Sequence, residues 1–316
     1  MNICFMGTPD IAVPTLQALI ERHTVSCVVT QPDKPKGRGK KLTPPPVKVL
    51  AQQHHIPVLQ PSRARALEFF TELSTYAFDV IVVIAYGQIL PQAILNMCSY
   101  GALNIHGSLL PKYRGASPIQ SAILNGEITT GVTIMQMDAG MDTGDMLLKR
   151  EIPVGDHTSG SLFELMGQVG AEALLETLTQ IQAGTVVRTP QDDSQATHAP
   201  LFTKAMGLID WTQTSQQITS LVNAMNPWPS AYTLLAGEPL KIHSVRLDTD
   251  INTVGGLYLS EKAPGQVLAA DSKHGIWVGT GDGALPLTLL QAKGGKAMAG
   301  KDYVNGRPIE VGTVLC

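Results

Sequence analysis

Short apolar runs alternate with helix-like segments through the first half of the chain. The strand-like runs cover 2–6, 24–30, 56–61, 78–86 and 102–106. Between them, apolar residues recur at helical spacing, as in 11–22. The apolar centre of the run at 78–86 is typical of a parallel strand buried on both faces. This alternation predicts an α/β fold with a doubly wound, mostly parallel sheet.

The pattern changes after residue 126. Two strands joined by an acidic, Gly-rich loop are predicted over 131–154, and a long helix over 159–184. The polar, Pro-bounded stretch 189–200 has no periodicity, which is typical of a linker. Short strands with frequent Gly turns then predict a small β-barrel. We therefore expect three parts, a first domain over 1–188, a linker over 189–206 and a C-terminal barrel over 207–316.

Charge is unevenly distributed along the chain. The 316 residues carry a net charge of −3, and 44% are hydrophobic, which suits a globular two-domain protein. Eight Lys and Arg residues and no acid lie between Lys34 and Leu67. This local cluster favours a polyanionic partner, and a solvated loop is the alternative. In the C-terminal part the charge is nearly balanced, so a basic face there must be local, around Lys293, Lys296 and Lys301.

Several classes of protein are disfavoured. The four cysteines show neither CxxC pairing nor a companion His at metal-ligand spacing, so we expect no metal site. The N-terminus lacks the pattern of a signal peptide, and no run approaches the roughly 20 apolar residues of a membrane span. Gly7 alone does not make a dinucleotide fingerprint. We therefore expect a soluble cytoplasmic protein, a monomer, with no NAD and no membrane contact.

The stretch "ALNIHGSLLPKYRGASP" at 102–118 carries the first candidate chemistry. In a strand, residues two apart share a face, so Asn104 and His106 project together one residue before Gly107. An amide donor beside an imidazole at a strand tip suits a developing negative charge. The alternative is a turn-capping Asn and a satisfied core His.

The loop "MDAGMDTGD" carries three acids, Asp138, Asp142 and Asp145. Their spacing misses the EF-hand pattern of a Ca²⁺ site. A carboxylate on such a loop, beside the ligand edge of a sheet, could orient a proton carrier. A solvated turn is the other reading of the loop taken alone.

These motifs together resemble a known family. Asn104-x-His106, "SLLPKYRG" and "DAGMDTGDML" are similar to the folate-dependent formyltransferases, and "FMGTPD", "TQPDKPKGRGKKL", "VVIAYGQILP", "IDW" and "NPWPSA" extend the resemblance along the chain. The resemblance implies a Rossmann-like catalytic domain and a C-terminal OB-like barrel that binds tRNA. It implies transfer of a formyl group from 10-formyltetrahydrofolate to the methionine amino group on initiator tRNA. In that chemistry, Asn104 and His106 would stabilise the oxyanion, and Asp142 would steer the proton.

The resemblance also assigns binding residues. The folate contacts it implies fall on two loops: Ser108, Leu109, Leu110 and Pro111, and Tyr86, Gly87, Ile89 and Leu90. The tRNA contacts expected from the resemblance and the local charge are Lys36, Arg38, Lys40, Lys41, Lys293 and Lys296. Arg38, with its planar fork, is the expected base or phosphate reader, and the lysines are backbone clamps.

Two rival functions stay open. An enzyme that formylates a small amine would share Asn104, His106 and Asp142 but would have no reason to carry "GRGKK" or the barrel. An RNA-binding module would explain the basic loop but not these three residues. One departure from the family pattern is the segment "FTKAMGL", shorter and less charged than usual, which leaves Lys204 as the basic residue near "IDW".

Overall fold

The computed structural model describes residues 1–36, 39, 41–247, 253–254, 257–258 and 263–316. The chain divides into two compact units. The N-terminal unit comprises Met1–Pro118, Thr129–Pro153 and Leu162–Ala199, and the C-terminal unit comprises Ile119–Ile128, Val154–Ser161 and Pro200–Cys316. The first half of the stretch expected as a linker, up to Ala199, thus has its contacts inside the N-terminal unit.

A seven-stranded sheet forms the centre of the N-terminal unit. Its order is β10-β9-β7-β6-β1-β2-β5, and its strands are β1 (Asn2–Gly7), β2 (Thr24–Val29), β5 (Val58–Leu59), β6 (Val80–Ile84), β7 (Ala102–His106), β9 (Thr129–Gln136) and β10 (Met146–Pro153). The pairings from β5 to β7 are parallel, and β9 and β10 are added antiparallel. The predicted fold class is confirmed.

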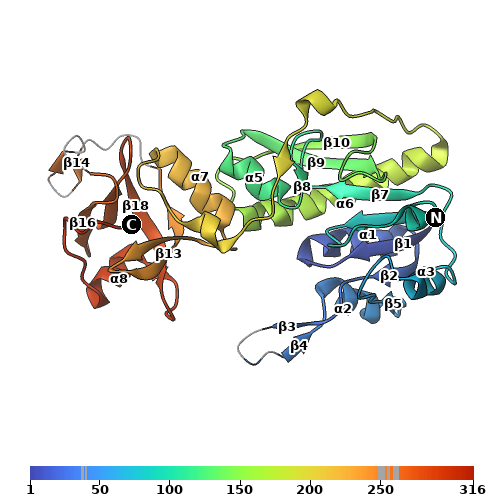
Figure 1. The fold of residues 1–316 in the computed structure, drawn as a ribbon, viewed down its shortest axis with the longest axis horizontal. Helices are drawn as coiled ribbons and strands as arrows, with labels where there is room; N and C mark the ends of the chain where they lie inside the picture. The colour runs from blue at the N-terminus through green and yellow to red at the C-terminus, as the bar shows by residue number, and fades with distance from the viewer. Residues whose placement is uncertain (37–38, 40, 248–252, 255–256, 259–262) are drawn as a thin grey trace. The chain divides into compact units, whose positions relative to one another are not determined.

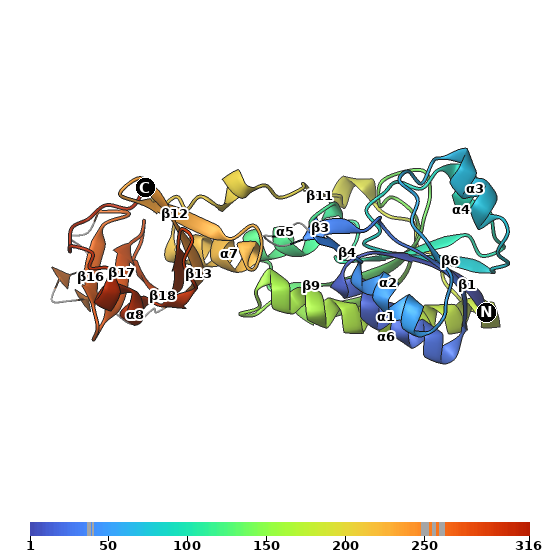
Figure 2. The ribbon, with the colours of Figure 1, turned by 90° about the horizontal axis from the view of Figure 1, so that it is seen from below.

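Helices cover both faces of this sheet. They are α1 (Val13–Arg22), α2 (Pro46–Gln53), α3 (Leu67–Leu73), α4 (Gln92–Leu95) and α6 (Ser159–Ala183). Figure 2 shows α1, α2 and α6 on one face and α3 and α4 on the other. The helix predicted at 159–184 is α6, which approaches β7 closely because Gly170 has no side chain: a Cβ there would lie 2.9 Å from Ile105 Cγ2.

Strand β1 contributes side chains to the hydrophobic core on both faces of the sheet. All its residues from Ile3 to Gly7 are buried, and successive side chains point to opposite faces. Cys4 and Met6 belong to a cluster with Phe69 and Leu73 of α3 and Ile94 of α4. Burial on both faces accounts for the continuous apolar runs in β1 and β6.

Two small strand pairs and several short helical elements also lie outside the main sheet. β3 (Lys34–Lys36) and β4 (Lys41–Thr43) form a hairpin that projects beyond α2 (Figure 1). β8 (Arg114–Gly115) pairs in parallel with β11 (His198–Ala199). The remaining short elements are α5 (Pro118–Leu124) and the 3-10 turns η1 (Asp10–Ala12) and η2 (Asp193–Gln195).

An antiparallel sheet forms the C-terminal unit. Its order is β12-β13-β18-β17-β16, with β19 beside β18, and the unit contains η3 (Lys204–Gly207), α7 (Ser215–Met225), β12 (Ala231–Leu235), β13 (Glu238–Val245), β14 (Thr253–Val254), β15 (Leu257–Tyr258), β16 (Val267–Asp271), β17 (Gly275–Gly279), β18 (Ala284–Ala292), β19 (Met298–Ala299) and α8 (Gly300–Gly306). Trp211, from the "IDW" motif, is buried and donates its indole N–H to Thr233 Oγ1 at 3.0 Å.

Candidate active site

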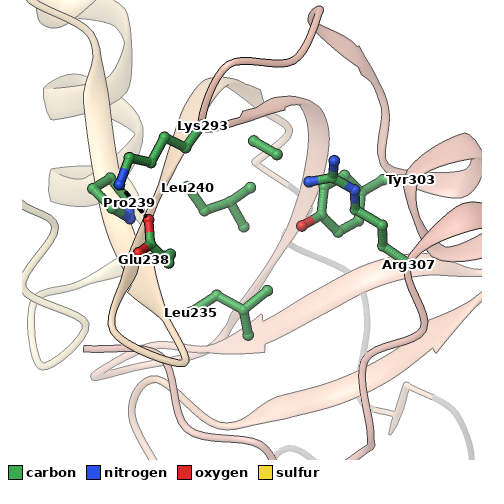
Figure 3. Close-up of a pocket in the computed structure, with 8 residues that line it drawn as sticks. Leu235, Glu238, Pro239, Leu240, Lys293, Tyr303 and Arg307 are labelled. Atoms are coloured by element: carbon green, nitrogen blue, oxygen red, sulfur yellow. Dashed lines mark hydrogen bonds and ion pairs between the residues drawn. The ribbon is translucent and has the colours of Figure 1, made fainter.

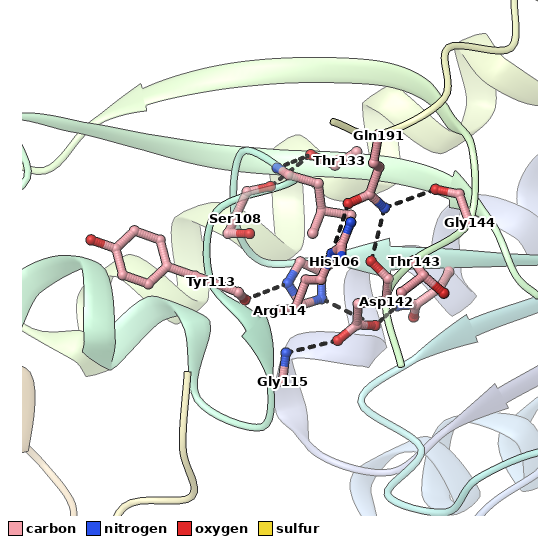
Figure 4. Close-up of polar contacts among 12 residues, drawn as sticks. His106, Ser108, Tyr113, Arg114, Gly115, Thr133, Asp142, Thr143, Gly144 and Gln191 are labelled. Carbon is pink, nitrogen blue, oxygen red and sulfur yellow. Dashed lines mark hydrogen bonds and ion pairs between the residues drawn. The ribbon is translucent and has the colours of Figure 1, made fainter. Parts of the chain in front are cut away.

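Three side chains predicted from the sequence meet at the end of β7. Asn104 and His106 share a face of the strand, as the two-residue spacing requires. Asn104 Nδ2 lies 3.5 Å from Asp142 Oδ1, and His106 Nδ1 lies 3.6 Å from the same oxygen. Both distances are long for hydrogen bonds. The structure therefore brings an amide, an imidazole and a carboxylate together around one point without locking them to each other. Figure 4 shows the imidazole of His106 and the carboxylate of Asp142.

The orientation of the His106 ring is set by its other nitrogen. The side chain is 5% exposed, and Nε2 lies 2.9 Å from the carbonyl oxygen of Tyr113. A carbonyl only accepts, so Nε2 carries a proton and donates it to Tyr113. Nδ1 is then the ring nitrogen that faces Asp142.

The Asp142 carboxylate is held by the main chain opposite. Its Oδ2 accepts a hydrogen bond from the backbone N–H of Gly115 at 2.9 Å. The residue itself has a φ of 56°, in the left-handed region that Asp tolerates better than most side chains. The carboxylate is 16% exposed, so it stays reachable from solvent while its direction is fixed.

Sequence reasoning missed the residues that support this loop. Gln191 Nε2 donates to the carbonyl oxygens of Asp142 and Gly144, each at 2.8 Å. Arg114 Nε donates to Gln191 Oε1 at 3.0 Å. Gln191 lies in the polar stretch interpreted as a linker, where no periodicity or motif marks a contact 49 residues away.

The first predicted folate loop, 108–111, is largely enclosed. Ser108 is fully buried and donates its hydroxyl to the carbonyl of Lys112 at 2.6 Å. Leu110 is also fully buried, and its N–H donates to Thr133 Oγ1 at 3.1 Å. Thr133 Oγ1 in turn donates to the Ser108 carbonyl at 2.7 Å. Leu109 and Pro111 are partly exposed, so a ligand could contact the side chains of these two residues of the loop.

The second predicted folate loop, 85–91, follows β6. Tyr86 is 2% exposed and packs in the core, and burial raises the pKa of its phenol to about 12. Its carbonyl accepts from Thr8 Oγ1 at 3.1 Å and from Gln31 Nε2 at 3.3 Å. Leu90 is buried, whereas Gly87 is exposed and Ile89 is 79% exposed. Ile89 is therefore the apolar side chain that this loop offers to a ligand.

The basic residues lie in two places. In the backbone register of the β3–β4 hairpin, Lys36 is paired with Lys41. Arg38 and Lys40 lie outside the residues that the structure describes. At the base of the hairpin, Lys48 Nζ donates to both carboxylate oxygens of Asp33, at 2.9 and 3.0 Å, and to Gln60 Oε1 at 2.7 Å.

In the C-terminal unit, Lys293 and Lys296 are exposed. Lys293 Nζ pairs with Glu238 Oε2 at 2.9 Å. The pair lies on the wall of a cavity of about 270 Å³ (Figure 3). The opposite wall has the Arg307 guanidinium 5.8 Å from the centre of the Tyr303 ring. The charge of Lys293 is thus partly neutralised within the unit.

The described residues include neither a candidate metal cluster nor a candidate membrane span. No three His, Cys, Asp or Glu side chains among them lie close enough together to hold a metal ion. Over the same residues, no helix combines the length and the apolar character that crossing a membrane requires.

A doubly wound α/β domain binds its ligands at the carboxyl ends of its parallel strands. The amide, imidazole and carboxylate at the end of β7 lie at that edge and have the chemistry of an enzyme site that moves protons and stabilises negative charge. Comparison with family models gives the particular family. Residues 1–178 match the formyl transferase model, and residues 202–308 match the formyl transferase C-terminal domain. The chain belongs to the formyl transferase family, as the sequence motifs predicted.

Curated relatives agree with this assignment. The chain is 49% identical to a methionyl-tRNA formyltransferase of Geobacter metallireducens, over 100% of this chain and 98% of the relative. It is 45% identical to one of Ruminiclostridium cellulolyticum, over 100% and 99%.

Two solved structures share the fold. One is HypX from Aquifex aeolicus in complex with tetrahydrofolic acid, with a TM-score of 0.66 and 20% identity. The match covers 99% of this chain but only 50% of the HypX chain. The other is WlaRD, a sugar 3N-formyl transferase crystallised with dTDP and 5-N-formyl-THF, with a TM-score of 0.64 and 19% identity over 93% and 97% of the two chains.

Proposed function

We propose that this enzyme transfers the formyl group of 10-formyltetrahydrofolate to the amino group of methionine on initiator tRNA, for the initiation of translation. The observation that carries the proposal is the meeting of Asn104, His106 and Asp142 at the end of β7. The full-length similarity to methionyl-tRNA formyltransferases supports the choice of acceptor. A role in translation implies a cytoplasmic location, and a monomer stays our prediction.

Asn104 and His106 have different roles in this reaction, as a hydrogen-bond donor and as a proton acceptor. When the amine adds to the formyl carbon, negative charge develops on the formyl oxygen, and the Asn104 amide is the donor that the strand tip offers to it. The attacking ammonium must first lose a proton. His106 Nδ1 is positioned to accept it, because Nε2 is already committed to the Tyr113 carbonyl.

Asp142 balances the charge that this creates. Its carboxylate faces His106 Nδ1 and stabilises the imidazolium once the ring is protonated. The Gly115 N–H keeps the carboxylate from turning away. As the tetrahedral intermediate collapses, the bond from the formyl carbon to the folate nitrogen breaks, and that nitrogen takes up the proton of the imidazolium, directly or through a water. The attacking nitrogen loses its second proton to solvent at this stage, which leaves the neutral formamide.

The folate fits the edge of the sheet where β6 and β7 end side by side. These strands pair in parallel, with Val83 opposite Asn104. The loop after β6 is anchored by Gln88, which accepts from the Ala64 N–H at 2.7 Å. The same loop carries the exposed side chain of Ile89, an apolar surface suited to a flat ring system.

The tRNA contacts are assigned to the β3–β4 hairpin and to the C-terminal unit. Lys36 and Lys41 are paired positions of this hairpin. Arg38 and Lys40 belong to the same stretch of sequence. Lys293 and Lys296 are the corresponding contacts of the C-terminal unit.

Formyl transfer measured in parallel with charged initiator tRNA, charged elongator tRNA and free methionine tests this function. We expect rapid transfer to initiator methionyl-tRNA and little to the other two. Equal transfer to free methionine, or none to any of the three, would contradict the proposal.

A further inference from the structure

We propose that Gln191 is a positioning residue, which holds the Asp142 carboxylate in line with Asn104 and His106. The inference rests on the role proposed above for Asp142. It assigns to the segment after α6 a part in the chemical step, although none of its residues belongs to the strand tip itself.

The Gln191 side-chain amide bridges the two ends of the turn formed by residues 142–144. Its Nε2 donates both of its hydrogens, one to the Asp142 carbonyl and one to the Gly144 carbonyl, each at 2.8 Å. Gly144 is pressed against the end of β9, where an added Cβ would lie 1.8 Å from the Gln136 carbonyl oxygen. The turn is thus held between β9 on one side and the Gln191 amide on the other (Figure 4).

Arg114 fixes which way this amide points. The Arg114 side chain is 9% exposed, and its Nε donates to Gln191 Oε1 at 3.0 Å while Nη2 donates to Asp193 Oδ1 at 2.7 Å. A flipped amide would place its oxygen against two carbonyl oxygens and its NH₂ against the guanidinium. The network therefore specifies one orientation.

The same segment fixes the side chain of Asp142 from the opposite direction. β11 pairs with β8, so that the Arg114 N–H donates to the Thr197 carbonyl at 2.8 Å and the Ala116 N–H to the Ala199 carbonyl at 2.9 Å. Between these two bonds lies Gly115, whose N–H donates to Asp142 Oδ2. Residues 191–199 thus hold both the main chain and the carboxylate of Asp142.

Such support matters because the reacting groups are only loosely coupled to each other. The Asp142 carboxylate lies 3.5 Å from Asn104 and 3.6 Å from His106, so neither contact alone would keep it in place. A displacement of about 1 Å in an active site can cost on the order of 100-fold in rate.

Gln191→Met tests the inference, because Met keeps the volume and removes both donors. Gln195→Met is the matched control: Gln195 lies on the same segment but donates to Asp192 Oδ2 at 2.8 Å, away from the turn. With saturating folate and methionyl-tRNA, we expect Gln191→Met to lower the single-turnover rate about 10- to 100-fold. The folate Kd and the thermal midpoint should change little, and the control should match the wild type.

A double-variant cycle separates this inference from the proposed function. If Gln191 acts through Asp142, adding Gln191→Met to Asp142→Asn should lower the rate by less than about 3-fold further. A full multiplicative loss, or an unchanged rate for Gln191→Met alone, would overturn the inference. A normal rate for Asp142→Asn would instead remove the proposed role of Asp142.

Hydrogen exchange gives a readout that does not depend on activity. The amides of residues 140–145 should exchange faster in Gln191→Met than in the wild type and in Gln195→Met. Gln191→Asn, which keeps the amide but shortens its reach, should behave in the same direction and serves if the Met variant folds poorly. Unchanged exchange in both Gln191 variants would contradict the inference.

Discussion

The imidazole of His106 donates from Nε2 to the carbonyl oxygen of Tyr113 over 2.9 Å, and this single bond turns Nδ1 toward Asp142. Tyr113 adopts a φ of 61°, a conformation that a bulky side chain seldom takes. The ring orientation is therefore tied to the backbone of the loop that follows β7, in which the predicted folate contacts 108–111 also lie.

Replacing the reacting groups should affect the rate more than the binding of folate. Asn104→Ala removes a donor to the developing oxyanion and should lower the single-turnover rate about 100- to 1000-fold. His106→Ala and Asp142→Asn should lower it about 100- to 10,000-fold, the range of general acid–base effects. Folate affinity should change far less, because the charge exists only near the transition state. A near-normal rate would withdraw the role of the residue concerned.

The cations of the hairpin should determine part of the salt dependence of tRNA binding. Each lysine that neutralises a phosphate contributes a slope of roughly −0.7 to −0.9 in log K against log salt. Lys40→Ala with Lys41→Ala should flatten the slope by about one to two units, for initiator and elongator tRNA alike. Arg38→Ala should reduce transfer to initiator tRNA further, and a full rescue by Arg38→Lys would reduce that residue to an electrostatic contact.

Variants of the Lys293–Glu238 ion pair test the proposed tRNA contact of the C-terminal unit, because removing either charge should change tRNA affinity in a known direction. Glu238 offsets the charge of Lys293 at 2.9 Å. Glu238→Gln should therefore strengthen tRNA binding and steepen its salt slope, whereas Lys293→Ala should weaken it. Filter binding at several salt concentrations measures both. If Glu238→Gln leaves the slope unchanged, Lys293 does not contact the tRNA backbone.

Asp33 should make stability depend on pH at the base of the hairpin. Hydrogen bonds from Lys48 and Gln60 hold the pKa of this carboxyl below its ordinary value. The ionised carboxylate of Asp33 then contributes fully to the free energy of unfolding above its unfolded-state pKa of about 3.9. This stabilisation is lost as the pH falls through the lower folded-state pKa. Asp33→Asn should lower the urea midpoint at pH 7, and the difference should shrink below about pH 4.

Lys48→Met is the matched control for this effect. It removes the cation that the Asp33 carboxylate accepts from, so it should lower the midpoint at pH 7 in the same way. Adding Asp33→Asn to Lys48→Met should then change the pH dependence little. A pH-independent difference between the wild type and Asp33→Asn would contradict the assignment.

Much of the fold was predictable because periodicity reports burial. The helix expected at 159–184 is observed at Ser159–Ala183, and the run expected at 102–106 is β7. β8 and β11 were not predicted, since strands of two residues have no period to detect. The β3–β4 hairpin was also missed, because Pro and Gly interrupt any alternation between Lys34 and Thr43.

The candidate site divides in the same way. Asn104 and His106 were found because a two-residue spacing places them on one face of a strand. The Gly115 N–H could not be predicted, because every residue except Pro has a backbone N–H. The role of the Gln191 amide could not be predicted either, because it depends on contacts with residues that are distant in the sequence. The ring orientation of His106 likewise depends on a carbonyl that no residue type identifies.

The Tyr113 N–H donates to Thr197 Oγ1, a partner 84 residues away in the chain. Closing a loop of this length costs conformational entropy that a local contact does not. The contact is also open to local release, because the segment 191–198 is mostly exposed and contributes little to the core. As denaturant rises, catalytic activity should therefore disappear before the buried sheet unfolds, which makes the enzyme's working range narrower than the range over which it is folded.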